Sequence, residues 1–275
     1  MKIGVTAAFS NQDCDPVRFA IELEQRGFSS LYLPHHTHLP VEEGAPPALV
    51  GGVSIEDYRS LPDPIVVLGA IASVTSKIRL GTGVLLVGQL DPIVLAKQLA
   101  TLDQLSKGRV TLGAGYGWNR KEAEAHGLDF EKRRSITNDK LACMRAIWAS
   151  DPASYQGTYV DLAPSWSRPK PVQSPSIPVL LGGFPGERLF STLPKVGDGW
   201  IPVGGTGLGK NIPLLREAFE RSGRDPDTLQ IVPFGVFPEK SKLEYFEGIG
   251  VTEVVLRVSS GSHDEMVAQL DAFSY

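Results

Sequence analysis

The sequence predicts a (β/α)8 barrel from three observations: eight short apolar segments, helical patterns between them, and the chain length. The 275 residues are 42% apolar and 21% charged, enough for a core of barrel size. The apolar segments are rich in leucine and β-branched residues and do not alternate strictly, as is typical of parallel strands covered on both faces. In order, they are residues 3–9, 30–33, 78–86, 109–112, 177–181, 199–203, 229–237 and 251–258.

The helical patterns have recognisable starts and ends. Three begin with Asp-Pro, at Asp15, Asp63 and Asp91, where the aspartate can cap the helix and proline fits its first position. Gly27 and Gly108 end the first and third of these helices. The other expected helices are residues 119–126, 132–148, 186–195, 208–221, 240–247 and 263–273. Strand and helix repeated eight times predict one barrel domain over residues 1–275, with an open doubly wound sheet as the alternative.

Two long segments lie outside the repeat, residues 34–62 after the second strand and residues 151–176 before the fifth. Loops of this length in a compact domain are usually functional or disordered. We expect them to cover a substrate.

Composition argues against two classes of partner. There are 27 basic and 31 acidic residues, a formal charge of -4, which gives no positive field for nucleic acid or anionic lipid. The longest apolar runs are far shorter than the roughly 20 residues of a membrane span, and no leader pattern precedes Lys2. Cys14 and Cys143 form no disulfide or zinc pattern. We therefore expect a cytoplasmic protein that binds neither nucleic acid nor membrane.

Histidines gather directly after the second strand. His35, His36 and His38 fall within four residues, and imidazole suits proton transfer near neutrality or metal ligation. A metal-dependent hydrolase using His36 and His38 is one alternative, but His126 and His263 are expected in helices, away from the strand ends. Solvent-facing loop histidines are a second alternative. The third is a histidine that bonds to a substrate or cofactor.

Glycines mark the ends of the third and fourth strands. Glycine within Thr82-Gly83-Val84 indicates a bulge or a close approach to a ligand, or else only barrel curvature. Gly115-Tyr116-Gly117-Trp118 combines glycines, which can present N–H groups to an anion, with two rings that could flank an aromatic cofactor or simply pack under a helix.

A third glycine-rich loop follows the fifth strand. Gly182-Gly183-Phe184 leads into a helix that carries Arg188 in its first turns. Free N–H groups at a helix start favour an anion, so this loop is a candidate phosphate site.

Taken in order, these loops resemble those of the bacterial luciferase-like flavin and deazaflavin oxidoreductases. The resemblance extends from Lys2 to about Gly204 and is closest to the branch that depends on the deazaflavin coenzyme F420. The matching motifs are Gly27-Phe28 with Leu33-Pro34-His35-His36, Ile78-Arg79-Leu80-Gly81-Thr82-Gly83-Val84, Leu95-Ala96-Lys97-Gln98-Leu99-Ala100-Thr101-Leu102-Asp103, Ser106-Lys107-Gly108-Arg109, Gly113-Ala114-Gly115-Tyr116-Gly117-Trp118, Arg168-Pro169-Lys170-Pro171, Ile177-Pro178-Val179 and Gly197-Asp198-Gly199-Trp200.

The resemblance implies a barrel fold and a site at the strand ends. It implies a cis peptide bond between Gly83 and Val84 behind the cofactor ring, and His36 as proton donor or partner at the hydride site. This chain has His35 where relatives carry an acid. The cofactor-binding residues implied by the loops and the resemblance together are His35, Thr82, Gly83, Val84, Gly115, Tyr116, Gly117, Trp118, Gly182, Gly183, Phe184 and Arg188.

The activity implied is hydride transfer between F420 and a small, neutral or apolar organic substrate, in a homodimer. An FMN-dependent luciferase-like monooxygenase is the alternative. A flavin-binding barrel without turnover is a second alternative, which His35 in place of the acid would favour.

Overall fold

The computed structural model describes residues 1–10, 14–41 and 55–273. Its strands are β1 (Lys2–Ala7), β2 (Ser30–Leu33), β3 (Arg79–Thr82), β4 (Val110–Ala114), β5 (Ala153–Gln156), β6 (Asp161–Ser165), β7 (Val179–Gly182), β8 (Gly199–Ile201), β9 (Gln230–Ile231), β10 (Phe234–Val236) and β11 (Glu253–Val258). Its α-helices are α1 (Pro16–Gln25), α2 (Ile55–Arg59), α3 (Pro64–Val74), α4 (Pro92–Ser106), α5 (Arg120–Ala125), α6 (Arg133–Ala149), α7 (Glu187–Val196), α8 (Leu208–Arg221), α9 (Lys240–Gly248) and α10 (His263–Asp271). Short 3-10 helices are η2 (Val87–Gln89), η3 (Phe130–Lys132) and η4 (Pro226–Thr228).

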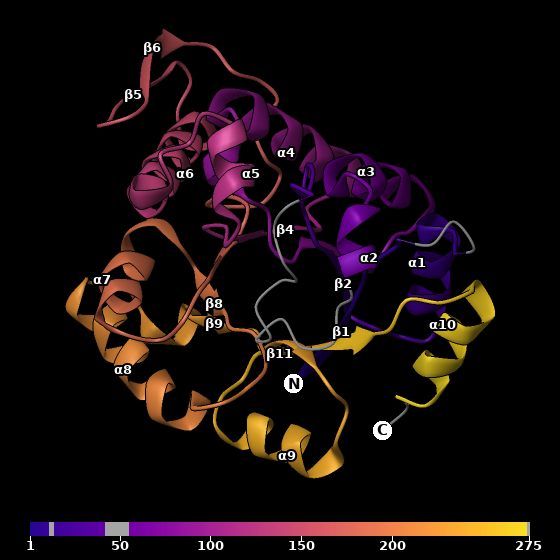
Figure 1. The fold of residues 1–275 in the computed structure, drawn as a ribbon. Coiled ribbons are helices and arrows are strands. Elements are labelled where there is room, and N and C mark those ends of the chain that lie inside the picture. Colours follow the sequence, from indigo (N-terminus) through magenta and orange to yellow (C-terminus); the bar gives the residue numbers. More distant parts are fainter. Residues whose placement is uncertain (11–13, 42–54, 274–275) are drawn as a thin grey trace.

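The main sheet is parallel and closes on itself. Its order is β10-β11-β1-β2-β3-β4-β7-β8-β9. β9 and β10 are two pieces of the strand expected at residues 229–237, interrupted near Pro233, which has no N–H to donate. β9 pairs with β8, β10 pairs with β11, and Val203 bridges to Phe234. Eight strand positions therefore form the predicted barrel, with helices around its outside (Figure 1).

The three Asp-Pro helix starts are confirmed. Asp15, Asp63 and Asp91 each accept hydrogen bonds from the backbone N–H groups two and three residues ahead, and proline occupies the first turn of each helix. An N-cap of this kind contributes about 1 kcal/mol to stability. The caps fix where α1, α3 and α4 begin on the outside of the sheet.

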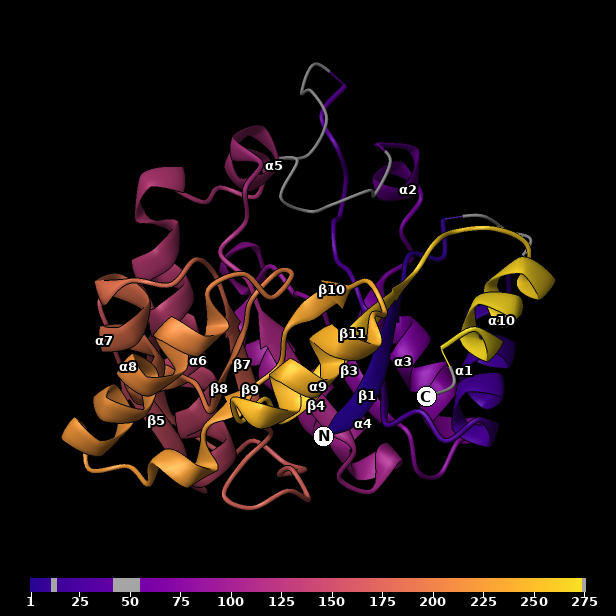
Figure 2. The same ribbon diagram turned by 90° about the horizontal axis from the view of Figure 1, so that it is seen from below.

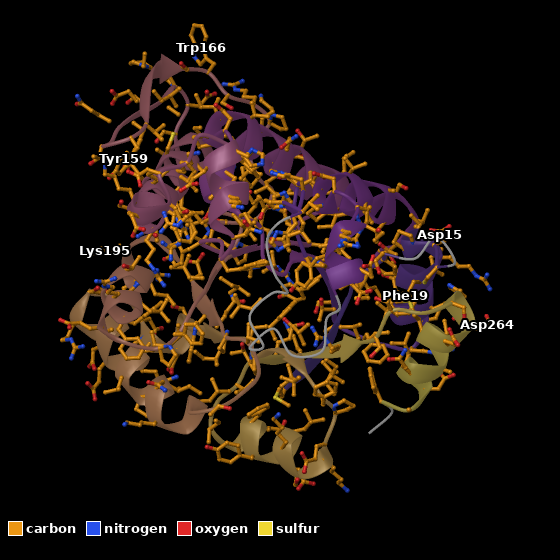
Figure 3. The ribbon with its side chains drawn as sticks, in the orientation of Figure 1. Asp15, Phe19, Tyr159, Trp166, Lys195 and Asp264 are labelled. Carbon is orange, nitrogen blue, oxygen red and sulfur yellow. The ribbon has the colours of Figure 1, made fainter. Side chains whose placement is uncertain are left out.

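Residues 151–176 differ from the prediction of an irregular loop over the substrate. β5 and β6 form an antiparallel hairpin beside α6, where Tyr155 donates to Asp139 (2.6 Å). Figure 3 shows Tyr159 and Trp166 at the outer edge of the molecule. Short, mostly polar strands interrupted by proline gave no strand signal in the sequence.

The remainder of this segment lies at the amino end of the barrel, below the strands in Figure 2. Gln173 donates to the buried carboxylate of Asp103 (2.8 Å) and accepts from Arg79, the first residue of β3 (3.2 Å). The part of the segment around Gln173 is therefore anchored opposite the carboxyl ends of the strands and does not cover a substrate there. The tip of the β5–β6 hairpin lies beside the first turns of α6, where the hydroxyls of Tyr159 and Ser135 are 3.2 Å apart. No helix in the described part of the chain is long and apolar enough to cross a membrane.

Candidate active site at the carboxyl ends of the strands

The carboxyl ends of β2, β3, β4 and β7 lie side by side because these strands are neighbours in the sheet. Thr82 Oγ1 links two of these ends by donating to the carbonyl oxygen of Gly113 (2.8 Å). Figure 2 shows α2 and α5 at this end of the barrel, opposite the amino end of β1. The four loops singled out in the sequence therefore converge where (β/α)8 barrels carry their active sites.

Val84 forms a bulge between the ends of β4 and β7. The peptide bond between Gly83 and Val84 is cis, as the resemblance implied. A Cβ atom on Gly115 would lie 2.3 Å from Val84 Cγ2, so a larger residue there would displace the bulge. A Cβ atom on Gly182 would lie 3.5 Å from Val84 Cγ1, at ordinary contact distance. Two of the predicted glycines thus receive the Val84 side chain.

Tyr116 connects the end of β4 to the loop after β7. Its ring lies 4.0 Å from the place where a Cβ atom of Gly183 would be. Its hydroxyl donates to Asn138 Oδ1 (3.2 Å), and the Arg134 guanidinium lies over its ring, 4.6 Å from the centroid. Burial raises the Tyr116 pKa, so the side chain remains a neutral phenol.

The loop after β7, predicted as a phosphate site, contains two glycines with positive φ, Gly183 and Gly186. Gly183 has φ of 138°, which disfavours any side chain, and its carbonyl oxygen accepts from Trp200 Nε1 (2.9 Å). Gly186, before α7, supplies no side-chain cap to the first N–H groups of the helix. Phe184 and Arg188 are exposed, on the surface of this loop and helix.

His35 is a buried, neutral histidine. Its Nδ1 accepts a hydrogen bond from the backbone N–H of Leu86 (3.3 Å), which ties the end of β2 to the loop after β3. Burial, followed by the neighbouring His36, lowers its pKa to about 4. At neutral pH this ring can accept at Nδ1 because its proton is on Nε2.

His36 is held by a carboxylate that the sequence did not reveal. Its Nδ1 lies 2.7 Å from Glu122 Oε2, while Glu122 Oε1 accepts the backbone N–H of Thr37 (3.1 Å). Glu122 is fully buried. Burial opposes its ionisation, but the hydrogen bond from His36 and the N–H of Thr37 bring its pKa below the usual value.

Two aromatic rings enclose His36. Tyr58 of α2 and Trp118 of the β4–α5 loop meet it edge to face, with centroids 5.0 and 5.6 Å away. Trp118, which the sequence predicted as a cofactor-binding residue, therefore contacts the ring of His36. Tyr58 was not predicted because no signal marked α2 within the long loop, and burial raises its pKa to about 12.

The signal for Glu122 was ambiguous. It follows Asn119 by three residues, the spacing of an ordinary helix capping box, and Asn119 Oδ1 does accept the N–H of Glu122 (2.9 Å). A capping-box acid reaches back to its own helix start, whereas this one turns to His36. Sequence spacing does not distinguish the two.

The expected separation of His126 from the strand-end histidines is wrong. His126 Nε2 lies 2.6 Å from Thr37 Oγ1, and its ring is 5.6 Å from that of His38. α5 folds back over the loop after β2, which brings them together. Among residues 1–10, 14–41 and 55–273, no three His, Cys, Asp or Glu side chains gather as a metal site.

A family model described as luciferase-like monooxygenase matches residues 12–238. The chain belongs to this luciferase-like family. An uncharacterised protein of Mycobacterium tuberculosis is 40% identical over 274 residues, 98% of this chain and 96% of that protein. An F420-dependent glucose-6-phosphate dehydrogenase of Kineococcus radiotolerans is 30% identical over 216 residues, which cover 75% of this chain and 58% of that enzyme.

Solved structures support the luciferase-like fold. The monooxygenase RslO1 of Streptomyces bottropensis has a TM-score of 0.82 at 18% identity, over 99% of this chain and 97% of that chain. An F420-dependent secondary alcohol dehydrogenase, in complex with an F420–acetone adduct, has a TM-score of 0.78 at 17% identity, over 100% of this chain and 99% of that chain. At such identities the likeness shows the fold alone.

Proposed function

We propose that the protein transfers a hydride between the deazaflavin coenzyme F420 and a small, neutral or apolar organic substrate. Luciferase-like relatives include F420-dependent dehydrogenases, which supports this choice of cofactor. Residues 1–275 act as one barrel domain in this proposal, and the cofactor lies across the carboxyl ends of β3, β4 and β7.

The observation that carries the proposal is the junction of Val84, Gly115 and Gly182. The Val84 side chain lies against glycines from two neighbouring strands, so at these two positions it meets backbone rather than a side chain. A flat ring could approach such a surface closely. Gly183 and the uncapped start of α7 would then hold the phosphate, and Tyr116 would flank the cofactor between them.

A buried amide lies near Gly117, two residues beyond Gly115, and could pair with a polar edge of a bound ring. Gln89 of η2 is buried, and neither atom of its amide group has a hydrogen-bond partner among the described residues. Its Nε2 lies 3.8 Å from the place of a Cβ atom on Gly117. An unpaired buried amide costs about 1–3 kcal/mol, which a bound polar group would offset.

In this proposal His36 handles the proton of the reaction. Bound F420 would supply or accept the hydride. In reduction, the imidazolium form of His36 would donate its Nε2 proton to the substrate oxygen and be left neutral with a proton on Nδ1, and in oxidation the neutral ring would take a proton up at Nε2. Tyr58 and Trp118 shield the ring from water in this proposal.

Single-turnover kinetics test the proposal. Reduced F420 and the protein are mixed with a panel of neutral aldehydes and ketones, and the return of oxidised F420 absorbance is followed. We expect turnover with at least one compound, slowed about 100-fold or more in His36→Ala and unchanged in His38→Ala. F420 binding without turnover across a broad panel would favour the flavin-binding barrel instead.

An FMN-dependent monooxygenase is the second candidate. The family model that matches residues 12–238 is described as luciferase-like monooxygenase, which favours this candidate. Oxygen consumption with reduced FMN, in the absence of F420 turnover, would support this candidate over the first.

We also propose a homodimer formed through α3 and α4. α3 has no charged residue, and exposed apolar side chains continue onto α4: Val66, Val74, Ile93 and Val94. A surface helix of this composition is typical of an interface. We place the protein in the cytoplasm because Cys14 and Cys143 are both unpaired.

A further inference from the structure

We infer that Glu122 is a positioning residue of this site: it fixes His36 in the tautomer with its proton on Nδ1, which leaves Nε2 to exchange a proton with the substrate. We call the hydrogen-bonded pair of Glu122 and His36 the dyad. Its role in catalysis rests on the proposed function, whereas its existence rests only on the contacts within this chain.

The carboxylate of Glu122 is fixed at both oxygens. Oε2 bonds to His36 Nδ1 at 2.7 Å, and Oε1 accepts the N–H of Thr37 at 3.1 Å. The backbone of Glu122 is held in turn, because its N–H donates to Asn119 Oδ1 (2.9 Å). The dyad therefore joins the first turn of α5 to the loop after β2.

The chemistry of the pair determines the tautomer. An ionised carboxylate only accepts hydrogen bonds, so the ring nitrogen facing it must carry a proton. A neutral imidazole has one N–H, and the lone pair is therefore on Nε2. The edge-to-face contacts of Tyr58 and Trp118 restrict rotation of the ring.

A purely structural role would not require a charge at this position. Burying a carboxylate costs several kcal/mol unless it is paired, and Thr37 supplies only one neutral donor. His36 provides the second contact and, among the described residues hydrogen-bonded to this carboxylate, it is the one that can become a cation. We interpret the buried charge as serving the orientation and protonation of His36.

The tautomer can be measured without cofactor or substrate. In ¹⁵N-labelled protein, long-range ¹⁵N–¹H spectra recorded over a range of pH show which His36 nitrogen carries the proton when the ring has a single N–H. We expect Nδ1 in the wild type and in Glu124→Gln, which changes an exposed acid of the same helix. We expect a population protonated at Nε2 in Glu122→Gln, because an amide can donate as well as accept.

A double-mutant cycle tests the catalytic part. With reduced F420 and the most reactive carbonyl compound of the panel, Glu122→Gln should slow single turnover about ten-fold or more. In the His36→Ala background the same change should have less than about a two-fold effect, because residues that act as a unit are not additive. Glu122→Asp, which keeps the charge, should restore part of the rate and the Nδ1 proton.

Each failure has a distinct signature. A wild-type ring protonated at Nε2, or a folded Glu122→Gln variant with an unchanged tautomer, would overturn the inference. If the effects of Glu122→Gln and His36→Ala on the single-turnover rate were additive, the catalytic part of the inference would be overturned. The expected tautomers without F420 turnover in the wild type would support the dyad and count against the proposed function.

Discussion

His35 determines how the end of β2 is attached to the rest of the site. The ring is 4% exposed and accepts the N–H of Leu86, so it must stay neutral to keep that bond. The acid that the resemblance implies at this position would, as a carboxylate, accept the same bond only by burying a charge. In this chain the carboxylate reaches the site from α5 instead, through Glu122.

The lowered pKa of His35 predicts a pH dependence of stability. The unfolded ring takes up a proton near pH 6.5 and the folded ring only near pH 4, so the unfolded state binds more protons between these values. The free energy of unfolding should therefore fall as pH decreases through this window, by about 3 kcal/mol from this residue.

Denaturant unfolding between pH 4 and 7 measures this contribution. His35→Asn keeps an acceptor for Leu86 but has no proton to gain, so its pH profile should be flatter than that of the wild type by this amount. The exposed His38→Asn serves as control. Parallel profiles for wild type and His35→Asn would show that His35 is not buried as described.

At the scale of elements, α3 is the helix on which the proposed dimer interface depends. Val66 is 72% exposed on this charge-free helix, so a polar substitution there leaves the barrel core intact. A glutamate at the centre of a dimer interface would be desolvated without a partner, at a cost of several kcal/mol.

Sedimentation velocity tests the proposed interface. We expect the wild type to sediment as a dimer and Val66→Glu to shift towards the monomer. Leu214→Glu, on α8 at the far side of the barrel, should remain a dimer (Figure 1). A monomeric wild type would contradict the interface, as would a Val66→Glu protein that remains dimeric.

For the whole molecule, the barrel was predictable because its signals repeat. Eight apolar segments and three Asp-Pro caps all predict the same barrel, so the fold could be predicted even where the signal of a single strand or helix was ambiguous. The glycine contacts around Val84 were predictable in position because glycine has few other uses at a strand end.

Contacts made by ordinary side chains across the fold were not predictable. Glu122 and Tyr58 approach His36 from α5 and α2, and nothing in their local sequence encodes the direction of their side chains. The anchoring of Gln173 to Asp103 likewise joins residues that only the closed barrel brings together. Each depends on tertiary packing rather than on local pattern.

The backbone conformation of Gly183 predicts how a substitution there changes the affinity for F420. An aspartate there would strain a backbone with φ of 138° and place a negative charge beside the proposed phosphate site. Gly183→Asp should weaken F420 binding by more than about ten-fold, equivalent to about 1.4 kcal/mol. Gly250→Asp, at a positive-φ glycine before β11, should bind as the wild type does.

The central claim is that this barrel binds F420 at the ends of β3, β4 and β7. Equilibrium titration of the wild type with F420 and with FMN, followed by cofactor fluorescence, tests it most directly. We predict that F420 binds at least about ten-fold more tightly than FMN and that Gly183→Asp weakens F420 binding by more than about ten-fold. Tighter binding of FMN, or F420 affinity unaffected by Gly183→Asp, would contradict the account.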